Sequence, residues 1–179
     1  MARIKIVERE SAPQEVAELY DEVKSRGATV INVQKVVANS PKVVRNFIRL
    51  GNSLLQRSKL EPKLRELAIM RTANLAGCEY EWKHHQSIAL QAGVKQEQLD
   101  QIANWQTAPV FDERERDILR YVDQVAQKIQ VPDDIFAGVR RHLEDQEIAE
   151  LTLSIGYWGM VARFIIALQV DLEQRYWEY

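Results

Sequence analysis

The chain has 179 residues, of which 46% are apolar, and it contains only seven glycines and five prolines. This length and composition favour one ordered globular domain with a substantial core, and the scarcity of turn-forming residues argues against a β-rich fold. The formal net charge is −2, with both signs spread along the chain and no basic stripe, so we expect no nucleic-acid partner.

Cysteine content and the distribution of apolar residues bear on location. The single cysteine, Cys78, excludes an intramolecular disulfide and is typical of a protein from a reducing compartment. Residues 1–14 contain no apolar run of signal-peptide length. No stretch of the sequence is expected to provide the roughly 20 apolar residues that a helix needs to cross a bilayer. We therefore expect a cytoplasmic protein with no membrane partner.

The first part of the chain is expected to form a short extended arm, residues 1–10, followed by a helix. Ser11 and Gln14 are typical of a helix start, as cap and return partner, and Gly27 is expected to end that helix. Residues 30–38 are rich in β-branched side chains, which favours a strand by propensity. Because no partner strand is evident elsewhere, we predict a short helix there.

The rest of the chain reads as a succession of helices with short connections. Ser40 and Pro41 form a cap and first-turn pair, and Glu61 with Pro62 starts another helix. A capping-box pattern begins at Asp112. The predicted helices cover residues 41–55, 62–76, 78–93, 95–105, 112–130, 133–143 and 145–176. About eight helices without a convincing strand predict an all-α domain.

Reactive side chains are concentrated in residues 66–93. On a helix starting near Cys78, the side chains of Cys78, Glu81, Trp82 and His85 follow one another at i, i+3, i+4 and i+7. That spacing predicts a thiol, a carboxylate, an indole and an imidazole along one helix face.

The preceding helix is expected to add a second carboxylate to this face. Glu66 lies on that helix, which should end at Gly77 and pack against its successor. Cys78 would then lie in the first turn of the second helix. Backbone N–H groups and the helix dipole favour a thiolate at such a position.

The spacing of Glu66, Cys78 and His85 resembles that of the carboxymuconolactone decarboxylase family, which includes the alkylhydroperoxidase-D-like proteins. Redox members of that family carry Glu, eleven residues, then Cys-x-x-Cys-x-x-x-His. Here Glu81 takes the place of the second cysteine, so a dithiol cycle within one subunit is impossible. The run Gly-Cys-Glu-Tyr-Glu-Trp at 77–82, followed by His85, resembles the decarboxylase-type branch.

The resemblance extends over residues 35–172 and is most specific at 66–93. It implies an alkylhydroperoxidase-D-like helical bundle, a single domain that forms a homo-oligomer, either a dimer, a trimer or a hexamer. We accordingly divide the chain into an N-terminal arm and helix, residues 1–34, and a carboxymuconolactone-decarboxylase-like helical domain, residues 35–179.

Four residues are candidates for catalysis. His85 titrates near working pH and would relay a proton, while Glu66 would orient it or balance its charge. The structural alternatives are a histidine hydrogen-bonded between two helices, and a carboxylate paired with a neighbouring arginine. Cys78 is a candidate nucleophile, although buried free cysteines are usually small hydrophobes. Glu81 is either a second acid or base, with a raised pKa if buried, or an ion-pair partner.

Substrate contacts are expected from Tyr80, Trp82, Trp158 and Arg163. An arginine at the mouth of a site suits a carboxylate, and the alternatives are aromatic packing and a solvent-exposed arginine. The adjacent His84 and His85 do not share a helix face, so we predict neither a metal site nor a cofactor.

The resemblance favours a cofactor-independent acid–base lyase acting on a small carboxylated lactone or a related ring acid. In that reading His85 supplies the proton that quenches the carbanion, with Glu66 and Glu81 setting its charge and tautomer. One alternative is a hydroperoxide reductase that uses Cys78 with an external thiol. Another is a helical oligomer that binds a small ligand and catalyses nothing.

Overall fold

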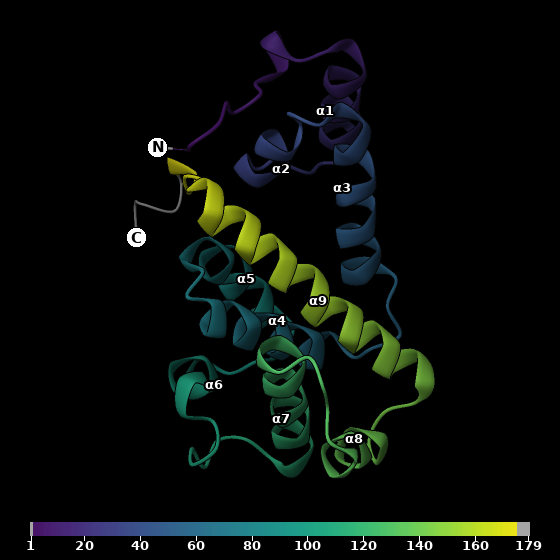
Figure 1. The fold of residues 1–179 in the computed structure, drawn as a ribbon, viewed down its shortest axis with the longest axis vertical. Helices are drawn as coiled ribbons and strands as arrows, with labels where there is room; N and C mark the ends of the chain where they lie inside the picture. The colour runs from purple at the N-terminus through teal and green to yellow at the C-terminus, as the bar shows by residue number, and fades with distance from the viewer. Residues whose placement is uncertain (1, 175–179) are drawn as a thin grey trace. The chain divides into compact units, whose positions relative to one another are not determined.

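The computed structural model describes residues 2–174, and the regular structure in that range is entirely helical (Figure 1). The all-α prediction is therefore confirmed for these residues. In that range the elements include the short 3-10 helices Arg9–Ser11 (η1) and Ile102–Asn104 (η2). The α-helices are Gln14–Ser25 (α1), Asn32–Val37 (α2), Pro41–Gln56 (α3), Pro62–Ala76 (α4), Glu79–Gln91 (α5), Gln96–Gln101 (α6), Glu113–Gln127 (α7), Asp133–Arg140 (α8) and Asp145–Leu168 (α9).

Local signals place several helix ends where they were predicted. Helices α3 and α4 begin at Pro41 and Pro62, because proline at the first helical position gives up an N–H that has no partner there. Asp112 and Glu115 form the predicted capping box at the start of α7. The Glu115 N–H donates to Asp112 Oδ1 at 2.8 Å, and the Asp112 N–H donates to Glu115 Oε2 at 3.0 Å.

Other ends differ from the predictions. Ser11 does not cap α1: it ends η1, and α1 starts at Gln14 directly after Pro13. The predicted helix at 95–105 is divided into α6 and η2. The last helix ends at Leu168, since Gln169 adopts a left-handed φ of 50° that stops the helical hydrogen bonds. Its predicted final residue, 176, lies outside the described residues.

The chain separates into two compact units, Met1–Ser53 with Ile165–Tyr179, and Leu54–Phe164. In the first unit the start of the described chain lies beside the end of α9, where the Arg3 N–H donates to the Leu168 carbonyl at 2.8 Å. The predicted boundary after residue 34 lies inside this unit and stays a prediction.

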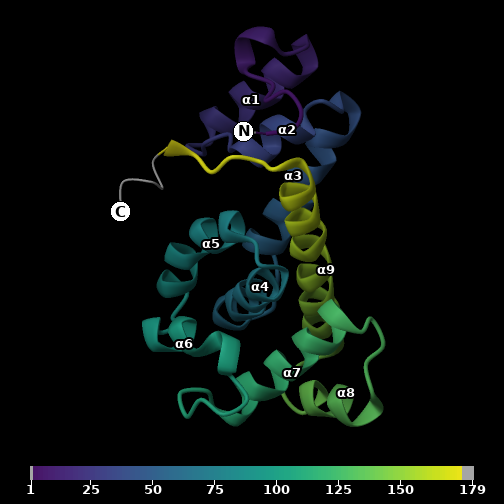
Figure 2. The same cartoon turned by 60° about the vertical axis from the view of Figure 1, so that its left-hand side comes forward.

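Helix α4 is the central element of the second unit. Its residues Leu64 to Ala73 are all buried, so it has no solvent-facing side over this length. It packs against α5 and α7, and Figure 2 shows it nearly end-on among the neighbouring helices. Toward α9, Ile69 joins Trp158 and Leu54 in an apolar cluster. A side chain on α4 therefore reaches α5, α7 or α9 according to its position around the helix.

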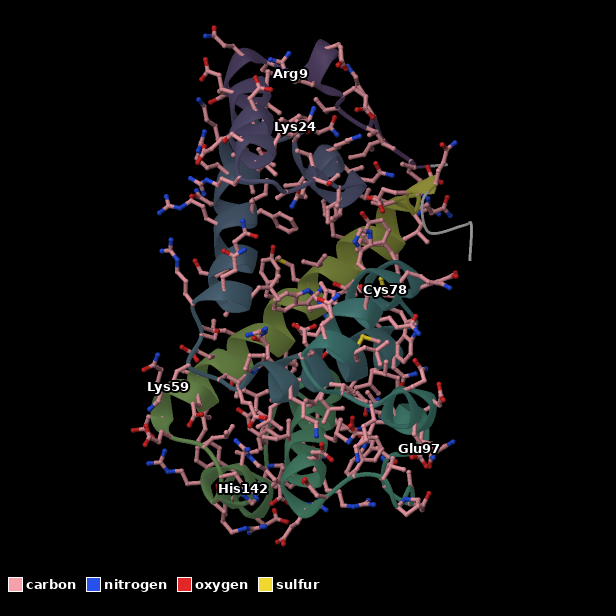
Figure 3. All side chains as sticks on the ribbon, turned by 180° about the vertical axis from the view of Figure 1, so that it is seen from behind. Arg9, Lys24, Lys59, Cys78, Glu97 and His142 are labelled. Carbon is pink, nitrogen blue, oxygen red and sulfur yellow. The ribbon has the colours of Figure 1, made fainter. Side chains whose placement is uncertain are left out.

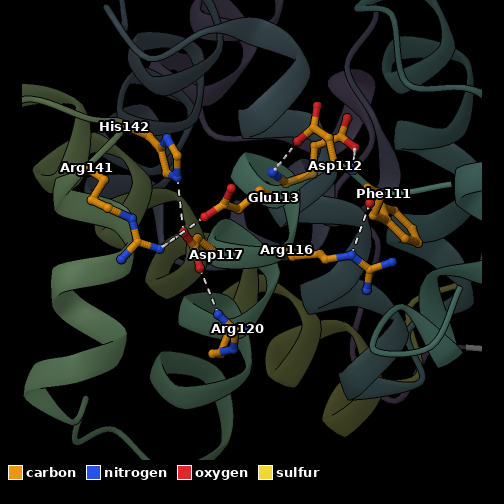
Figure 4. A network of polar contacts seen from close by, with 9 residues as sticks. Phe111, Asp112, Glu113, Arg116, Asp117, Arg120, Arg141 and His142 are labelled. Atoms are coloured by element: carbon orange, nitrogen blue, oxygen red, sulfur yellow. Dashed lines mark hydrogen bonds and ion pairs between the residues drawn. The ribbon is translucent and has the colours of Figure 1, made fainter. Parts of the chain in front are cut away.

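A buried carboxylate ties α7 to α8 in the same unit. The Asp117 side chain is 3% exposed and accepts hydrogen bonds from Arg120 Nη1 at 2.7 Å, Arg141 Nη2 at 2.7 Å and His142 Nε2 at 3.0 Å (Figure 4). Gly138 permits this approach, because a Cβ atom there would lie 3.1 Å from Asp117 Oδ1. The network fixes how α8 sits on α7.

Helix α9 departs from the expectation that no stretch has the length and apolarity of a membrane span. By length and composition Asp145–Leu168 meets that description, with a mean hydropathy of 1.6 over 18 residues, of which 44% are buried in the protein. Core helices of soluble proteins have the same properties, so this is weak support for a membrane span. The described residues otherwise look like a soluble domain.

Candidate functional site

Glu66 and His85 meet where α4 packs against α5. Gly77, with a φ of 63°, ends α4 and lets the chain turn directly into α5. The two helices are therefore close neighbours, and His85 Nδ1 lies 2.9 Å from Glu66 Oε2. Glu66 has no exposed surface, and the His85 side chain is 9% exposed. The pair is thus a buried carboxylate–imidazole contact.

The other ring nitrogen of His85 is engaged by α9. Trp158 Nε1 donates a hydrogen bond to His85 Nε2 at 2.8 Å, and the two rings meet edge to face. An indole N–H can only donate, so His85 Nε2 must be unprotonated and must accept. The ring proton then lies on Nδ1 and is donated to Glu66. His85 is held as one defined neutral tautomer, and Nε2 becomes free to accept a proton only if Trp158 moves.

An arginine next in sequence partly balances the charge of Glu66. Arg65 Nε lies 3.3 Å from Glu66 Oε1, and both side chains are buried. Arg71, the next arginine along α4, instead forms a two-pronged ion pair with Asp123, at 2.7 and 3.0 Å. The negative charge of Glu66 is therefore balanced partly by Arg65 and partly by the hydrogen bond from the His85 N–H.

Glu81 is a buried carboxyl group whose oxygens have no hydrogen-bond partner. The residue is 2% exposed, and neither Oε1 nor Oε2 finds a donor. Removal from water destabilises the charged form and raises the pKa of Glu81 to about 8. At neutral pH this group is mostly the uncharged acid, which carries a proton that it can donate. Of the two interpretations of Glu81, the structure thus excludes the ion pair within the described residues.

The structure corrects the prediction of a thiolate at Cys78. Cys78 lies at the N-cap of α5, as labelled in Figure 3, but its side chain is 2% exposed. The pKa of the thiol is raised to about 11, mainly by burial and to a smaller extent by the negative charge of Glu81. Backbone N–H groups of Tyr80 and Glu81 lower the pKa, but their effect is the smaller one. The backbone N–H groups at the N-terminus of α5 therefore do not offset the rise in the pKa of Cys78 that desolvation causes.

The four residues predicted to contact a substrate have different surroundings. Tyr80 is buried and stacks on His84, with ring centroids 4.5 Å apart. Trp82 packs against the apolar cluster that contains Leu67 and Met70. The predicted single strip from Cys78 to His85 is thus divided, because Trp82 faces the core.

The two predicted contacts on α9 also differ. Trp158 is buried against His85, whereas Arg163 is exposed and donates to the Gly159 carbonyl of its own helix at 2.6 Å. Tyr157 meets Trp158 edge to face, and burial followed by the nearby charge of Glu81 raises the pKa of its phenol. The phenol therefore stays protonated beside the Glu81 carboxyl.

One buried polar group received no role from the sequence. Ser154 is fully buried on α9, and its hydroxyl has no hydrogen-bond partner. It precedes Trp158 by one helical turn, but nothing in its local sequence distinguishes it from a solvent-facing serine. Within residues 2–174, no three His, Cys, Asp or Glu side chains are grouped as metal ligands would be.

Comparison with known proteins finds a family match for part of the chain. Residues 41–124 match the model of the carboxymuconolactone decarboxylase family. The uncharacterized protein YnjA of Escherichia coli (strain K12) is 28% identical over 119 residues, which are 66% of this chain and 65% of that protein. The match thus spans just under two thirds of that relative's length.

Two solved structures share the fold. Protein ATU0492 from Agrobacterium tumefaciens, of unknown function, has a TM-score of 0.71 and 26% identity, covering 77% of this chain and 95% of that one. The alkylhydroperoxidase AhpD core of an uncharacterized peroxidase-related protein from Ralstonia eutropha JMP134 has a TM-score of 0.83 and 21% identity, covering 98% and 94%. These matches support the carboxymuconolactone decarboxylase and AhpD-like family for residues 41–124, and the described residues have the AhpD-like all-α fold.

Proposed function

We propose that this protein is a cofactor-independent carboxy-lyase that acts on a small carboxylated lactone or a related ring acid, with Glu81 as its proton donor. The observation that carries the proposal is the buried, unpartnered Glu81 carboxyl with a pKa of about 8. Acid catalysis is most effective when the pKa of the acid lies near the working pH. An uncharged acid also avoids repulsion of an anionic substrate, which an ionised carboxylate would cause.

The proposed reaction balances without an external reagent. The bond between the ring carbon and its carboxylate breaks, and CO₂ leaves. The bonding electrons pass to the conjugated carbonyl of the lactone. The Glu81 proton then moves to the ring carbon that carries the resulting negative charge, and solvent returns a proton to Glu81. The partner of the protein is thus a small-molecule carboxylate, and we place the protein in the cytoplasm.

The Glu66–His85–Trp158 contacts support this assignment of roles. His85 carries its ring proton on Nδ1, directed at Glu66, and its Nε2 is covered by Trp158. In this arrangement His85 is not positioned to give a proton to a substrate. We propose that it positions α4, α5 and α9 around Glu81, one helical turn away on α5. A direct proton relay by His85 would require the indole to withdraw.

Peroxide reduction through Cys78 is the weaker alternative. A thiol must ionise before it attacks a peroxide, and a pKa of about 11 leaves roughly one thiolate in ten thousand at pH 7. Mass spectrometry of the intact protein after peroxide treatment separates the two functions. Oxidation of Cys78 at stoichiometric peroxide would favour thiol chemistry, whereas an unmodified thiol favours the lyase.

The lyase is tested with carboxymuconolactone as the probe, by following loss of the lactone and release of CO₂. We expect Glu81→Gln, which keeps the shape but cannot donate an acidic proton, to lower kcat by roughly 10²- to 10⁴-fold. Glu79→Gln is the matched control, because Glu79 is exposed two residues earlier on the same helix. Equal turnover by Glu81→Gln and wild type, at matched folding, would remove Glu81 from the reaction. A thermal shift with the lactone but no turnover would favour the binding protein.

A further inference from the structure

Arg65 is a buried arginine whose guanidinium has few partners. The residue is 5% exposed, and within residues 2–174 its side chain makes one hydrogen bond, from Nε to Glu66 Oε1 at 3.3 Å. Arg71 is buried to a similar degree on the same helix, yet it makes four hydrogen bonds, two of them with Asp123. A guanidinium carries five N–H groups, and burying them without acceptors is costly. Nη1 and Nη2 of Arg65 therefore need an acceptor, which the described chain supplies for Arg71 but not for Arg65.

Ser154 on α9 is a second buried donor without an acceptor. Its hydroxyl has no hydrogen-bond partner among the described residues. Hydroxyl groups on helices commonly donate to the carbonyl one turn earlier, as Thr72 does to Ala68 and Thr152 does to Ile148. The Ser154 hydroxyl does not do so, and it therefore calls for an acceptor outside its own helix.

Arg65 and Ser154 lie one turn before two residues that belong to one apolar cluster. Ile69 of α4 and Trp158 of α9 share that cluster. Arg65 precedes Ile69 by four residues, and Ser154 precedes Trp158 by four. Residues four apart on a helix lie on the same face. Both unsatisfied donors are therefore on the faces through which α4 and α9 meet.

The contacts between α4 and α9 follow the same order along both helices. Near their beginnings Leu64 shares an apolar cluster with Leu151. Further along, a Cβ atom at Gly159 would lie 3.8 Å from Thr72 Cγ2. The two unsatisfied donors therefore lie on the same side of the cluster between them. All of these residues belong to the unit Leu54–Phe164.

We propose that the Arg65 guanidinium and the Ser154 hydroxyl together bind one carboxylate group of a small acid. The planar edge formed by Nη1 and Nη2 matches the two oxygens of a carboxylate, and a remaining lone pair can accept from the hydroxyl. A carboxylate also supplies negative charge, which Arg65 receives only in part because Glu66 is engaged by His85 as well. Naming this acid as the substrate of the lyase rests on the proposed function.

The carboxylate bound here is one that the substrate keeps. Loss of CO₂ removes a negative charge, so an ion pair with the departing carboxylate would stabilise the ground state more than the transition state. Glu81 is uncharged at neutral pH and imposes no such penalty on the carboxylate that leaves. Arg65 and Ser154 thus fix the orientation of the substrate, and they have no part in proton transfer.

The first experiment measures binding of 2-furoate, a ring acid, by isothermal titration calorimetry, with the uncharged 2-furamide as its counterpart. We expect the acid to bind at least roughly tenfold more tightly than the amide. Arg65→Lys keeps the charge beside Glu66 but removes the planar edge, so affinity for 2-furoate should fall by roughly tenfold. Arg57→Lys is the matched control, because Arg57 is exposed in the same unit.

Three results of the calorimetry overturn the proposal. They are no binding of 2-furoate at millimolar concentration, equal binding of acid and amide, and equal affinity of Arg65→Lys and wild type. Sulfate bound as tightly as 2-furoate would likewise overturn the carboxylate assignment, since the planar edge should favour the planar anion.

The second experiment tests Ser154 without a destabilising change. Ser154→Ala removes an unsatisfied buried hydroxyl, so its melting temperature should equal or exceed that of the wild type, while affinity for 2-furoate falls several-fold. Ser87→Ala, an exposed change on α5, is the control. A lower melting temperature with unchanged affinity would make the hydroxyl structural and remove it from the carboxylate site.

Turnover of carboxymuconolactone separates this site from the lyase itself. Arg65→Lys should raise KM and leave kcat nearly unchanged, because it binds ground state and transition state alike, whereas Glu81→Gln should lower kcat. Binding of 2-furoate that depends on Arg65, without lactone turnover, would support the carboxylate site and reject the lyase. Turnover that depends on Glu81, with KM and 2-furoate affinity unchanged in Arg65→Lys, would support the lyase and reject the carboxylate site.

Discussion

Glu81 is a carboxyl group that folding removes from water without giving it a partner. Its pKa is about 8 in the folded protein and 4.5 in an exposed reference. Between these values the folded state holds a proton that the unfolded state has lost. The free energy of unfolding therefore falls as pH rises from about 4.5 to 8, by an amount on the order of a few kcal/mol. A cost of this size, borne at neutral pH, is typical of functional sites.

Glu81→Gln should remove this dependence. An amide of the same shape does not ionise, so the variant should gain stability relative to the wild type as pH rises through that window. Urea unfolding at pH 5 and pH 8 measures the effect, and Glu79→Gln gives the baseline for an exposed carboxylate on the same helix. If both variants show the same pH dependence as the wild type, Glu81 is ionised or hydrated in the folded protein.

Trp158 determines which nitrogen of His85 carries the proton. Since the indole donates to Nε2 at 2.8 Å, nitrogen-15 spectra of labelled imidazole should show a protonated Nδ1 and an unprotonated Nε2 in the wild type. Trp158→Phe removes the donor and leaves Nε2 buried without a partner. We expect that change to cost about 1–3 kcal/mol and to mix the tautomers. Trp82→Phe, which alters a partly buried indole on α5, should leave the His85 signals unchanged.

Sequence spacing predicted which residues gather at the site better than it predicted their chemical state. Glu66 and His85 are separated by one helix, one turn at Gly77 and part of a second helix, so their proximity follows from local rules. Trp158 lies 73 residues from His85 and reaches it only through tertiary packing. The raised pKa values of Glu81 and Cys78 likewise depend on burial, which no local pattern reveals.

At the scale of elements, helix starts were predictable where one residue type has a single physical role. Pro62 at the start of α4 and the Asp112 capping box are examples. Ser11 failed because Pro13 lies between it and the helix and sets the start of α1 instead. The end of α9 at Leu168 was missed because apolar residues continue beyond it, while the left-handed turn at Gln169 comes from a residue without a strong preference for it.

One buried carboxylate, Asp117, makes the polar contacts between α7 and the end of α8, beside the apolar packing of Ile118 and Val139. Asp117→Asn keeps the volume but removes the charge that faces Arg120, Arg141 and His142. Asp117 is buried, but Arg120 and Arg141 are about half exposed, so solvent compensates part of the lost contact. We expect a loss of about 1–2 kcal/mol in the free energy of unfolding. Urea denaturation checks this, with Asp134→Asn on the exposed side of α8 as the control. Equal stability of the two variants would mean that solvent replaces the network at no cost.

At the scale of the whole molecule, the division into two units predicts unequal local stability. Helix α4 in the second unit buries ten of its fifteen residues, whereas α1 in the first unit buries three of its twelve. Protection from hydrogen exchange follows the free energy of the smallest opening that exposes an amide. Amides of α4 and α7 should therefore exchange near the rate of global unfolding, and those of α1 and α2 faster.

Helix α9 provides an internal comparison for this prediction, because it continues from one unit into the other at residue 165. Hydrogen exchange measured by mass spectrometry on overlapping peptides should show strong protection around Leu151 and Ile155, whose side chains are buried in the central core. Protection should decrease toward Leu168. Uniform protection along α9 and across both units would instead mean that the chain unfolds as one cooperative body, since a helix cannot be locally weaker at one end while every opening is global.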